Sequence, residues 1–347
     1  MSTMLAKMGL SFNDVTLVPQ HSEIATRKTV DLSTQLGTLK LQVPLISANM
    51  DSITGLKMAM AMSEAGGLGI LHRYQSSEKT IQDIRHLKTG GQLAVPSIGI
   101  KESDKDLVLV YKDAGADAIC IDVAHGDHQG CDDMVAFAAK YFDNVIAGNV
   151  VTTWAAKRLF NSGANIIKVG IGSGSTCTTR MVTGHGVPQI TALMDICSMK
   201  KIIPARLYVI SDGGAKTSGD CVKALACGAD AIMSGSLFSG CNETPDFDSQ
   251  GRQTEHGGSK LYRGMASRQA REQFYGNHDA VPEGEAVTSV WSRGSARATI
   301  EHLAGGIRSG LSYSGCTNLQ EFQDCAIMMQ VTHYSYIEGT PHYSNHV

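Results

Sequence analysis

Ala114-Gly-Ala-Asp-Ala-Ile-Cys120 and Cys227-Gly-Ala-Asp-Ala-Ile-Met233 repeat one local pattern, and Ser162-Gly-Ala-Asn-Ile-Ile-Lys168 is a third version of it. In each, a helix-like stretch ends at a glycine, which suits the left-handed position after a helix, and a short apolar run follows at once. We interpret each as the point where a helix ends and a buried strand begins. The recurrence predicts repeated strand and helix units.

The apolar runs of the chain are short and continuous rather than alternating, as in parallel strands that are buried on both faces. They lie at 43–49, 67–71, 96–100, 118–123, 144–149, 166–171, 207–211 and 231–237. Eight such strands with helical stretches between them predict a (β/α)8 TIM barrel of the α/β class. An open, doubly wound sheet is the competing architecture, but it would need fewer strands and usually one dominant glycine loop.

Polar and glycine residues follow nearly every predicted strand. Examples are Ser47-Ala-Asn-Met-Asp51, Asp122-Val-Ala-His-Gly126 and Ser211-Asp-Gly-Gly214. TIM barrels build their active sites from these strand ends, so we expect the chemistry to gather on one face.

We expect residues 1–347 to form a single catalytic barrel domain. Residues 241–290 are polar and glycine-rich and are expected to form a lid or flap inserted over the barrel mouth after the eighth strand. Residues 334–347 show little periodicity and are expected to form an extended or mobile tail. No linker to a second domain is visible.

The composition excludes several classes of protein. With 42% hydrophobic residues and 37 glycines, the chain is not disordered. Its 30 basic and 33 acidic residues provide no field that would attract nucleic acid or an anionic membrane, so a bound anion must be held locally. The N-terminal stretch is too polar for a secretory signal and no apolar run is long enough to span a membrane, which predicts a cytoplasmic protein.

The cysteines suggest neither a disulfide framework nor a zinc site, because their number is odd and no two are spaced as CxxC. The nine are Cys120, Cys131, Cys177, Cys197, Cys221, Cys227, Cys241, Cys316 and Cys325. Most lie in apolar runs and are expected to be reduced and buried.

The segment from Lys168 to Arg180, KVGIGSGSTCTTR, is the most informative for function. Its alternating glycines let the backbone approach a ligand, and hydroxyl groups and a cation follow Cys177. A cysteine in a glycine loop is commonly structural, but such neighbours favour a thiolate that acts as a nucleophile.

Two later strand ends suggest a ribose-phosphate site. Asp212 beside two glycines would accept hydrogen bonds from sugar hydroxyls, or it would cap the next helix. Met233-Ser-Gly-Ser-Leu237 places small residues after the eighth strand, where barrels commonly bind phosphate.

Other polar residues have simpler interpretations. A metal pair of His125 and His128 lacks a third ligand at suitable spacing, and His185 is expected to serve loop geometry. Glu283 and Glu285 are, by default, solvated carboxylates of the lid.

Together these segments resemble the IMP dehydrogenase / GMP reductase family. The matching motifs extend from Phe12-Asn-Asp14 to Tyr313-Ser-Gly315 and cover nearly the whole chain. They include ISANMDS, CIDVAHG, AGNVVT, KVGIGSGSTCTTR, GVPQITA, VISDGG and YRGMAS.

The resemblance implies that Cys177 attacks C2 of a purine nucleotide and forms a covalent adduct. The implied nucleotide-binding residues are Ser47, Met50, Ser175, Asp212, Gly213, Gly214, Gly235, Ser236, Tyr262, Gly264, Met265 and Ser267. The implied residues for a nicotinamide cofactor are Arg73, Asp122, Ala124, Gly172, Ser312, Tyr313 and Gly315. Main-chain carbonyls of Gly172, Gly174 and Cys177 would bind a monovalent cation such as K⁺, and the assembly would be a homotetramer.

The sequence of the flap should distinguish the two branches of the family, the dehydrogenases and the reductases. Dehydrogenases oxidise IMP to XMP with NAD and hydrolyse the adduct with a flap that carries an adjacent Arg-Tyr pair, whereas reductases convert GMP and NADPH to IMP and ammonia. Only 17 residues separate Met265 from Glu283, and they contain no such pair. Only 23 residues separate His72 from Pro96, where many dehydrogenases carry an inserted pair of CBS domains.

The resemblance to a reductase implies that Thr179 and Glu283 form a relay that protonates the leaving ammonia, because an amine leaves poorly without a positioned acid. It also implies that Arg73 contacts the 2′-phosphate of NADPH. We therefore expect an NADPH-dependent GMP reductase.

Two alternatives stay open: an IMP dehydrogenase without CBS domains, and a catalytically silent purine-nucleotide sensor. Two segments are closer in sequence to the motifs of dehydrogenases, namely Tyr262-Arg-Gly-Met265 and Val281-Pro-Glu-Gly284. Ser173 replaces a proline common in both branches, and Thr176 is unusual beside the nucleophile.

Overall fold

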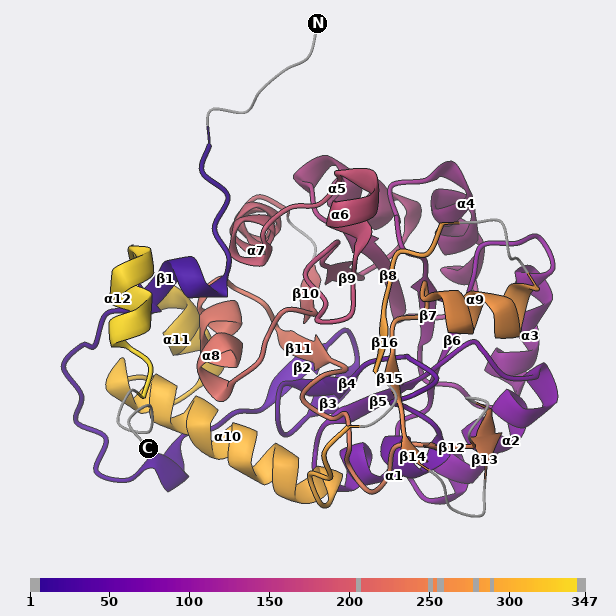
Figure 1. Ribbon diagram of the computed structural model, residues 1–347, viewed down its shortest axis with the longest axis horizontal. Coiled ribbons are helices and arrows are strands. Elements are labelled where there is room, and N and C mark those ends of the chain that lie inside the picture. The colour runs from indigo at the N-terminus through magenta and orange to yellow at the C-terminus, as the bar shows by residue number, and fades with distance from the viewer. Residues whose placement is uncertain are drawn as a thin grey trace, which may run out of the picture.

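Eight parallel strands close into a barrel in the computed structural model, which describes residues 7–203, 207–248, 252–254, 259–276, 281–287 and 290–341 (Figure 1). The barrel strands are β4 (Leu45–Ser47), β5 (Leu68–Leu71), β6 (Val95–Ile98), β7 (Ile119–Asp122), β8 (Val145–Val150), β9 (Ile166–Val169), β10 (Tyr208–Asp212) and β11 (Ala231–Ser234). The last strand, β11, pairs in parallel with the first, β4. The predicted TIM barrel is confirmed, and each predicted apolar run overlaps one of these strands.

Helices pack around the outside of the barrel. They are α1 (Leu56–Glu64), α2 (Ser77–Thr89), α3 (Asp104–Asp113), α4 (Gln129–Ala138), α5 (Thr153–Ser162), α7 (Gln189–Ser198), α8 (Ser218–Ala226) and α10 (Ala296–Tyr313). The glycines of the repeated pattern, Gly115, Gly163 and Gly228, have φ angles of 99°, 118° and 101°. These left-handed positions end α3, α5 and α8 and turn the chain into the next strand, as the pattern predicts.

The barrel interior is filled by alternate residues of the strands. They include Ile46, Ile70, Val95, Cys120, Ile146, Ile166, Ile210 and Met233. A hairpin of β2 (Thr34–Leu36) and β3 (Leu39–Leu41) adds Leu36, Leu39 and Leu41 to the same cluster. At the carboxyl ends of the strands this apolar filling gives way to polar side chains.

A long insertion separates β11 from α10, as predicted. It contains β12 (Asp246–Phe247), β13 (Gln253–Thr254), β14 (Ser259–Lys260), β15 (Tyr262–Arg263), α9 (Arg268–Tyr275) and β16 (Ala286–Val287). Residues 249–251, 255–258, 277–280 and 288–289 of the predicted lid lie outside the described residues. An ion pair between Asp51 and Arg263, both with fully buried side chains, ties β15 to the loop after β4.

The two ends of the described chain meet beside the barrel. Strand β1 (Val15–Leu17) pairs antiparallel with β17 (Met328–Gln330). The remaining elements are η1 (Phe12–Asp14), η2 (Arg27–Thr29), α6 (Thr179–Thr183), η3 (Met199–Lys201), α11 (Leu319–Cys325) and α12 (His333–Glu338).

The extended tail expected from residue 334 is wrong for its first part. Helix α12 forms there because the Thr332 side chain caps it by accepting a hydrogen bond from the Ser335 amide. Residues 342–347 of the predicted tail lie outside the described residues. None of the helices that the structure describes combines the length and the apolar character that crossing a membrane requires.

Candidate active site

A cavity of about 490 Å³ opens at the carboxyl ends of the barrel strands. Its wall comes from the loops after β4, β5, β7, β9, β10 and β11 and from the insertion. The expectation that the polar strand ends gather on one face is therefore confirmed.

Cys177 lies in the cavity wall, on the glycine loop between β9 and α6. The loop follows β10 closely: a Cβ atom on Gly170, whose φ is 149°, would lie 2.1 Å from the Asp212 carbonyl oxygen. The Cys177 thiol donates a hydrogen bond of 3.2 Å to the Thr179 hydroxyl. That hydroxyl donates in turn to Glu283, over 3.0 Å. The three predicted catalytic side chains thus form one hydrogen-bonded series.

Backbone hydrogen bonds hold the Glu283 segment against the cysteine loop. The Thr178 amide donates to the Glu283 carbonyl over 3.0 Å, and the Glu285 amide donates to the Thr176 carbonyl over 2.8 Å. On its other side, the Glu283 amide donates to the Ala266 carbonyl. The default expectation of two solvated carboxylates is right for Glu285, which is exposed, and wrong for Glu283.

Cys177 is the single cysteine in the wall of this cavity. Burial raises the pKa of Cys120, Cys131, Cys221 and Cys227 to about 12. These thiols stay protonated near neutral pH and pack as small apolar groups, as predicted.

The predicted nucleotide residues Met50, Ser175, Asp212, Gly213, Gly214, Gly235, Ser236, Tyr262, Gly264 and Met265 all line the cavity. The hydroxyls of Ser175 and Tyr262 are 2.8 Å apart and join the cysteine loop to β15. Burial raises the pKa of Tyr262 above its ordinary value, so its phenol stays neutral. A Cβ atom on Gly235 would lie 2.8 Å from the Met50 sulfur, so the glycine lies close against Met50.

Asp212 does not cap the following helix. Thr217 caps α8 by accepting a hydrogen bond from the Asp220 amide. The Asp212 carboxylate instead accepts from Lys168 over 3.1 Å and from Asn149 over 2.9 Å. The capping alternative is therefore wrong, and this carboxylate belongs to the cavity.

Five predicted residues lie outside the cavity wall. Ser47 is buried and accepts a hydrogen bond from Thr54. Ser267 caps α9 by accepting from the Ala270 amide. Ser312, Tyr313 and Gly315 lie at the carboxyl end of α10. Ser267 nevertheless lies next to the cavity, because its amide donates to the Gly264 carbonyl over 2.9 Å.

The predicted cofactor residues Arg73, Asp122, Ala124 and Gly172 do line the cavity. The Arg73 Nε atom is 4.0 Å from the Asp122 carboxylate. The Arg73 guanidinium also lies over the Tyr74 ring, 4.7 Å from its centre. A cation and a carboxylate therefore share the side of the cavity formed by β5 and β7.

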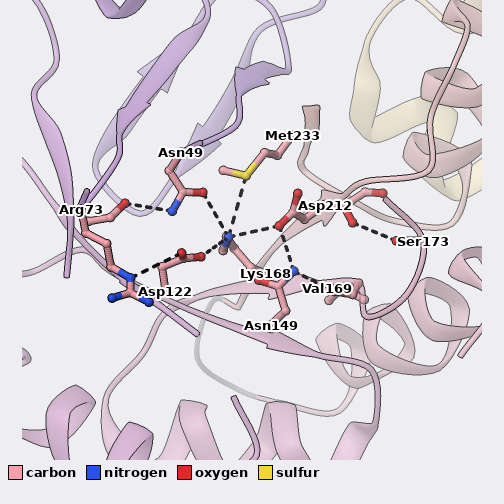
Figure 2. A network of polar contacts seen from close by, with 12 residues as sticks. Asn49, Arg73, Asp122, Asn149, Lys168, Val169, Ser173, Asp212 and Met233 are labelled. Carbon is pink, nitrogen blue, oxygen red and sulfur yellow. Dashed lines mark hydrogen bonds and ion pairs between the residues drawn. The ribbon is translucent and has the colours of Figure 1, made fainter. Parts of the chain in front are cut away.

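Lys168 and Asn149 are cavity residues that sequence reasoning missed (Figure 2). Lys168 is 2% exposed and donates to Asp122 over 2.9 Å and to Asp212. The sequence did contain a signal for Lys168. Lys168 is two residues after Ile166 on β9, and residues two apart on a strand point to the same side. Asn149 had no comparable signal, because its amide meets Asp212 only through the fold.

The structure places the three histidines that the sequence analysis considered. His125 is exposed, and His128 caps α4 by accepting from the Gly130 amide. The His185 ring is 2.9 Å from the Thr183 carbonyl, within its own loop. In the described ranges, no three His, Cys, Asp or Glu side chains gather as metal ligands.

A monovalent cation on the carbonyls of Gly172, Gly174 and Cys177 stays a prediction. The Gly174 carbonyl accepts a hydrogen bond from the Cys177 amide over 3.1 Å. One of the three expected ligand oxygens is therefore already engaged by the loop itself.

Comparison with known proteins finds relatives along nearly the whole chain. The sequence profile described as IMP dehydrogenase / GMP reductase domain matches residues 9–342. Inosine-5'-monophosphate dehydrogenase of Nitrosopumilus maritimus is 30% identical, with 97% of this chain and 98% of that protein covered. The proteins of the same name from Streptococcus pyogenes and Staphylococcus aureus are 30% and 31% identical, with 98% and 97% of this chain and 96% of each protein covered.

The relatives are longer than this chain. The alignment with the Nitrosopumilus protein runs over 478 positions, whereas this chain has 347 residues. Over a quarter of the aligned positions are therefore residues of the relative without a counterpart here.

Proposed function

Because the chain belongs to the IMP dehydrogenase / GMP reductase family of oxidoreductases, we propose that it is a GMP reductase that converts GMP and NADPH to IMP, ammonia and NADP⁺. The observation that carries the proposal is the hydrogen-bonded series from Cys177 through Thr179 to Glu283. A reductase needs this series at two moments, when the thiol loses its proton and when the amine gains one.

The first step forms the bond between sulfur and carbon. The Cys177 thiol passes its proton to Thr179, whose own hydroxyl proton moves to Glu283, and the sulfur attacks C2 of the guanine. The directions of the two hydrogen bonds are those that this transfer requires.

The second step breaks the bond between C2 and the amine. The proton stored on Glu283 returns through Thr179 to the departing nitrogen, which leaves as ammonia. The thiol and the C2 amine thus become a thioether adduct and ammonia, with no proton left over. A dehydrogenase that forms its adduct from IMP has no amine to protonate.

The remaining step requires a nicotinamide cofactor, which supplies the hydride that replaces sulfur at C2. The charges on one side of the cavity fit such a group, because Arg73 provides a cation for a 2′-phosphate and Asp122 provides an acceptor for a carboxamide. Cys177 is then released as a thiolate and takes up a proton from the solvent. The hydroxyls of Ser175, Ser236 and Tyr262 suit the phosphate of the nucleotide, and Asp212 suits its ribose.

An IMP dehydrogenase is the second candidate, and the names of the relatives favour it. A dehydrogenase must hydrolyse its adduct, and the 17 residues between Met265 and Glu283 contain no adjacent Arg-Tyr pair for that purpose. A silent nucleotide sensor is less well supported, because binding alone requires no series of proton carriers.

The absorbance of the reduced cofactor separates the three functions. The purified protein is mixed with GMP and NADPH, or with IMP and NAD. Loss of absorbance with GMP alone supports the reductase, and a gain with IMP alone overturns it in favour of the dehydrogenase. Nucleotide binding without either change supports the sensor.

The proton relay has a separate test. Glu283→Gln and Thr179→Val should each slow ammonia release by a factor of about 10² to 10³, whereas Glu285→Gln, with an exposed side chain nearby, should not. Hydride transfer measured from IMP and NADP⁺ in reverse should change less. Equal losses in both steps would remove Glu283 from the relay.

A further inference from the structure

The ammonium group of Lys168 lies at the centre of the polar network in Figure 2. It donates to Asp122 over 2.9 Å, to Asp212 over 3.1 Å and to the Asn49 side-chain oxygen over 3.4 Å. The Met233 sulfur is a fourth and weaker acceptor, 3.9 Å away, so the three protons of the ammonium group are all engaged.

Gly148, a glycine on the neighbouring strand, leaves the space through which Lys168 reaches Asp122. Lys168 pairs in register with Gly148 on β8, and Gly148 pairs with Asp122 on β7. A Cβ atom on Gly148 would lie 2.7 Å from the Lys168 Cβ and 2.5 Å from the Lys168 carbonyl oxygen. Because position 148 has no side chain, the lysine on β9 spans β8 and also meets Asp212 on β10.

The charges of the network depend on one another. Burial by itself would lower the pKa of Lys168, but the Asp122 and Asp212 carboxylates outweigh burial and raise it. The lysine therefore stays charged and separates two carboxylates that would otherwise repel each other and the phosphates of a ligand.

We infer that Lys168 is a positioning residue that holds Asp122 and Asp212 in place together and thereby couples binding of the purine nucleotide to binding of the cofactor. The inference rests on the proposed function, in which Asp212 binds the ribose and Asp122 faces the nicotinamide. Lys168 itself acts through these carboxylates. It sets the distance between the two ligands that must meet at C2.

The coupling is measured as the change in GMP affinity caused by NADP⁺, which carries no hydride to transfer, so the complex cannot complete a turnover. Calorimetry on the full chain compares the unmodified protein with Lys168→Met, Lys168→Arg and Lys200→Met. Lys200 is a matched control, because its Nζ lies 2.7 and 2.8 Å from the Asp230 carboxylate, away from the cavity wall.

Lys168→Met should abolish the coupling and raise KM for both GMP and NADPH about tenfold. Lys168→Arg should restore part of the coupling and part of the affinity for both ligands. Lys200→Met should change neither the coupling nor either KM. A change in KM for one ligand alone, or equal effects of Lys168→Met and Lys200→Met, would overturn the inference.

The pH profile gives a readout that a purely structural lysine would not move. Burial alone would raise the pKa of Asp122, but Lys168 and then Arg73 hold it below its ordinary value. Asp122 is therefore ionised above a low pKa. Loss of Lys168 raises that pKa, so the acidic limb of kcat/KM for NADPH should move to higher pH in Lys168→Met and return in Lys168→Arg. If the acidic limb of kcat/KM stayed at the same pH in Lys168→Met, the result would contradict the inference.

A double variant covers the case in which Lys168→Met does not fold. Lys168→Met/Asp122→Asn removes the cation together with one carboxylate and should still bind GMP about tenfold more weakly than Asp122→Asn alone, because Asp212 has lost its lysine. Equal affinities would overturn the inference.

Failure of the proposed function is distinguishable from failure of this inference. If IMP and NAD react instead of GMP and NADPH, the same variants are measured with that pair, in which case only the reductase assignment fails. If the protein binds no purine nucleotide, both fail.

Discussion

Tyr262 is one of the residues through which the insertion contacts the loop that carries Cys177. Its hydroxyl lies 2.8 Å from Ser175, while its ring is buried beside Gly235. Burial raises its pKa, so the phenol is a neutral donor at every pH below about 10.

Tyr262→Phe should therefore raise KM for the nucleotide about tenfold with little change in kcat, because the proposed hydrogen bond to the phosphate would be lost while the ring stays packed. The increase should be the same from pH 6 to pH 9, since the phenol does not titrate in that range. Steady-state kinetics at several pH values would test this, and a large fall in kcat at constant KM would contradict it.

At the scale of elements, the buried pair of Asp51 and Arg263 determines where β15 lies. Both side chains are fully buried, and the Arg263 guanidinium also donates to Gln273 of α9 over 2.9 Å. One arginine thus joins the loop after β4, strand β15 and helix α9.

Arg263→Met should lower the free energy of unfolding by about 3 to 5 kcal/mol, because it leaves the Asp51 carboxylate buried without its cation. Arg252→Met is the matched control, since Arg252 pairs with Asp248 at the surface and should matter by less than about 1 kcal/mol. Denaturant titration measures both. Equal effects would show that the buried pair does not hold β15.

The corner between α10 and α11 places two thiols in contact. The sulfurs of Cys316 and Cys325 are 2.6 Å apart, and both thiols donate to the Ser314 carbonyl. Diamide, a thiol oxidant, should therefore join them first, and the two electrons and two protons that the thiols lose would reduce the diazene to a hydrazine.

Peptide mass analysis should find this link, with a loss of about 2 Da, before any link to the buried Cys120 or Cys131. Cys316→Ser should prevent it. Oxidation of Cys177 alone under the same conditions would contradict the expectation.

At the scale of the whole molecule, the pairing of β1 with β17 joins the two ends of the described chain. Removal of residues 326–347 should lower Tm by several degrees, because β1 loses its partner strand and Leu17 loses cover. Nucleotide binding should persist, since the cavity uses none of these residues. Removal of 342–347 alone is the control. An unchanged Tm in the longer truncation would show that the pairing contributes nothing.

The barrel was predictable from the sequence because buried parallel strands leave continuous apolar runs, and the glycines that end α3, α5 and α8 mark where three of these runs begin. The series of Cys177, Thr179 and Glu283 was expected from the resemblance alone. Spacing could not reveal it, because Thr179 and Glu283 are 104 residues apart.

Other features could not be read from the sequence. The contacts of Lys168 require side chains from several strands to meet at one layer of the barrel, and no local pattern records that meeting. Helix α12 was missed because all its residues are at the surface, so no buried stripe marks it.

The closed barrel has a consequence for how such a chain changes in evolution. Strands β11 and β4 complete the barrel whatever the length of the insertion that follows, so the segment that carries Glu283 can lengthen or shorten without disturbing the cylinder. Cys177 lies on a loop of the barrel itself, whereas Glu283 lies on the insertion. One ancestral adduct chemistry can thus diverge into separate reactions by exchange of a single surface segment.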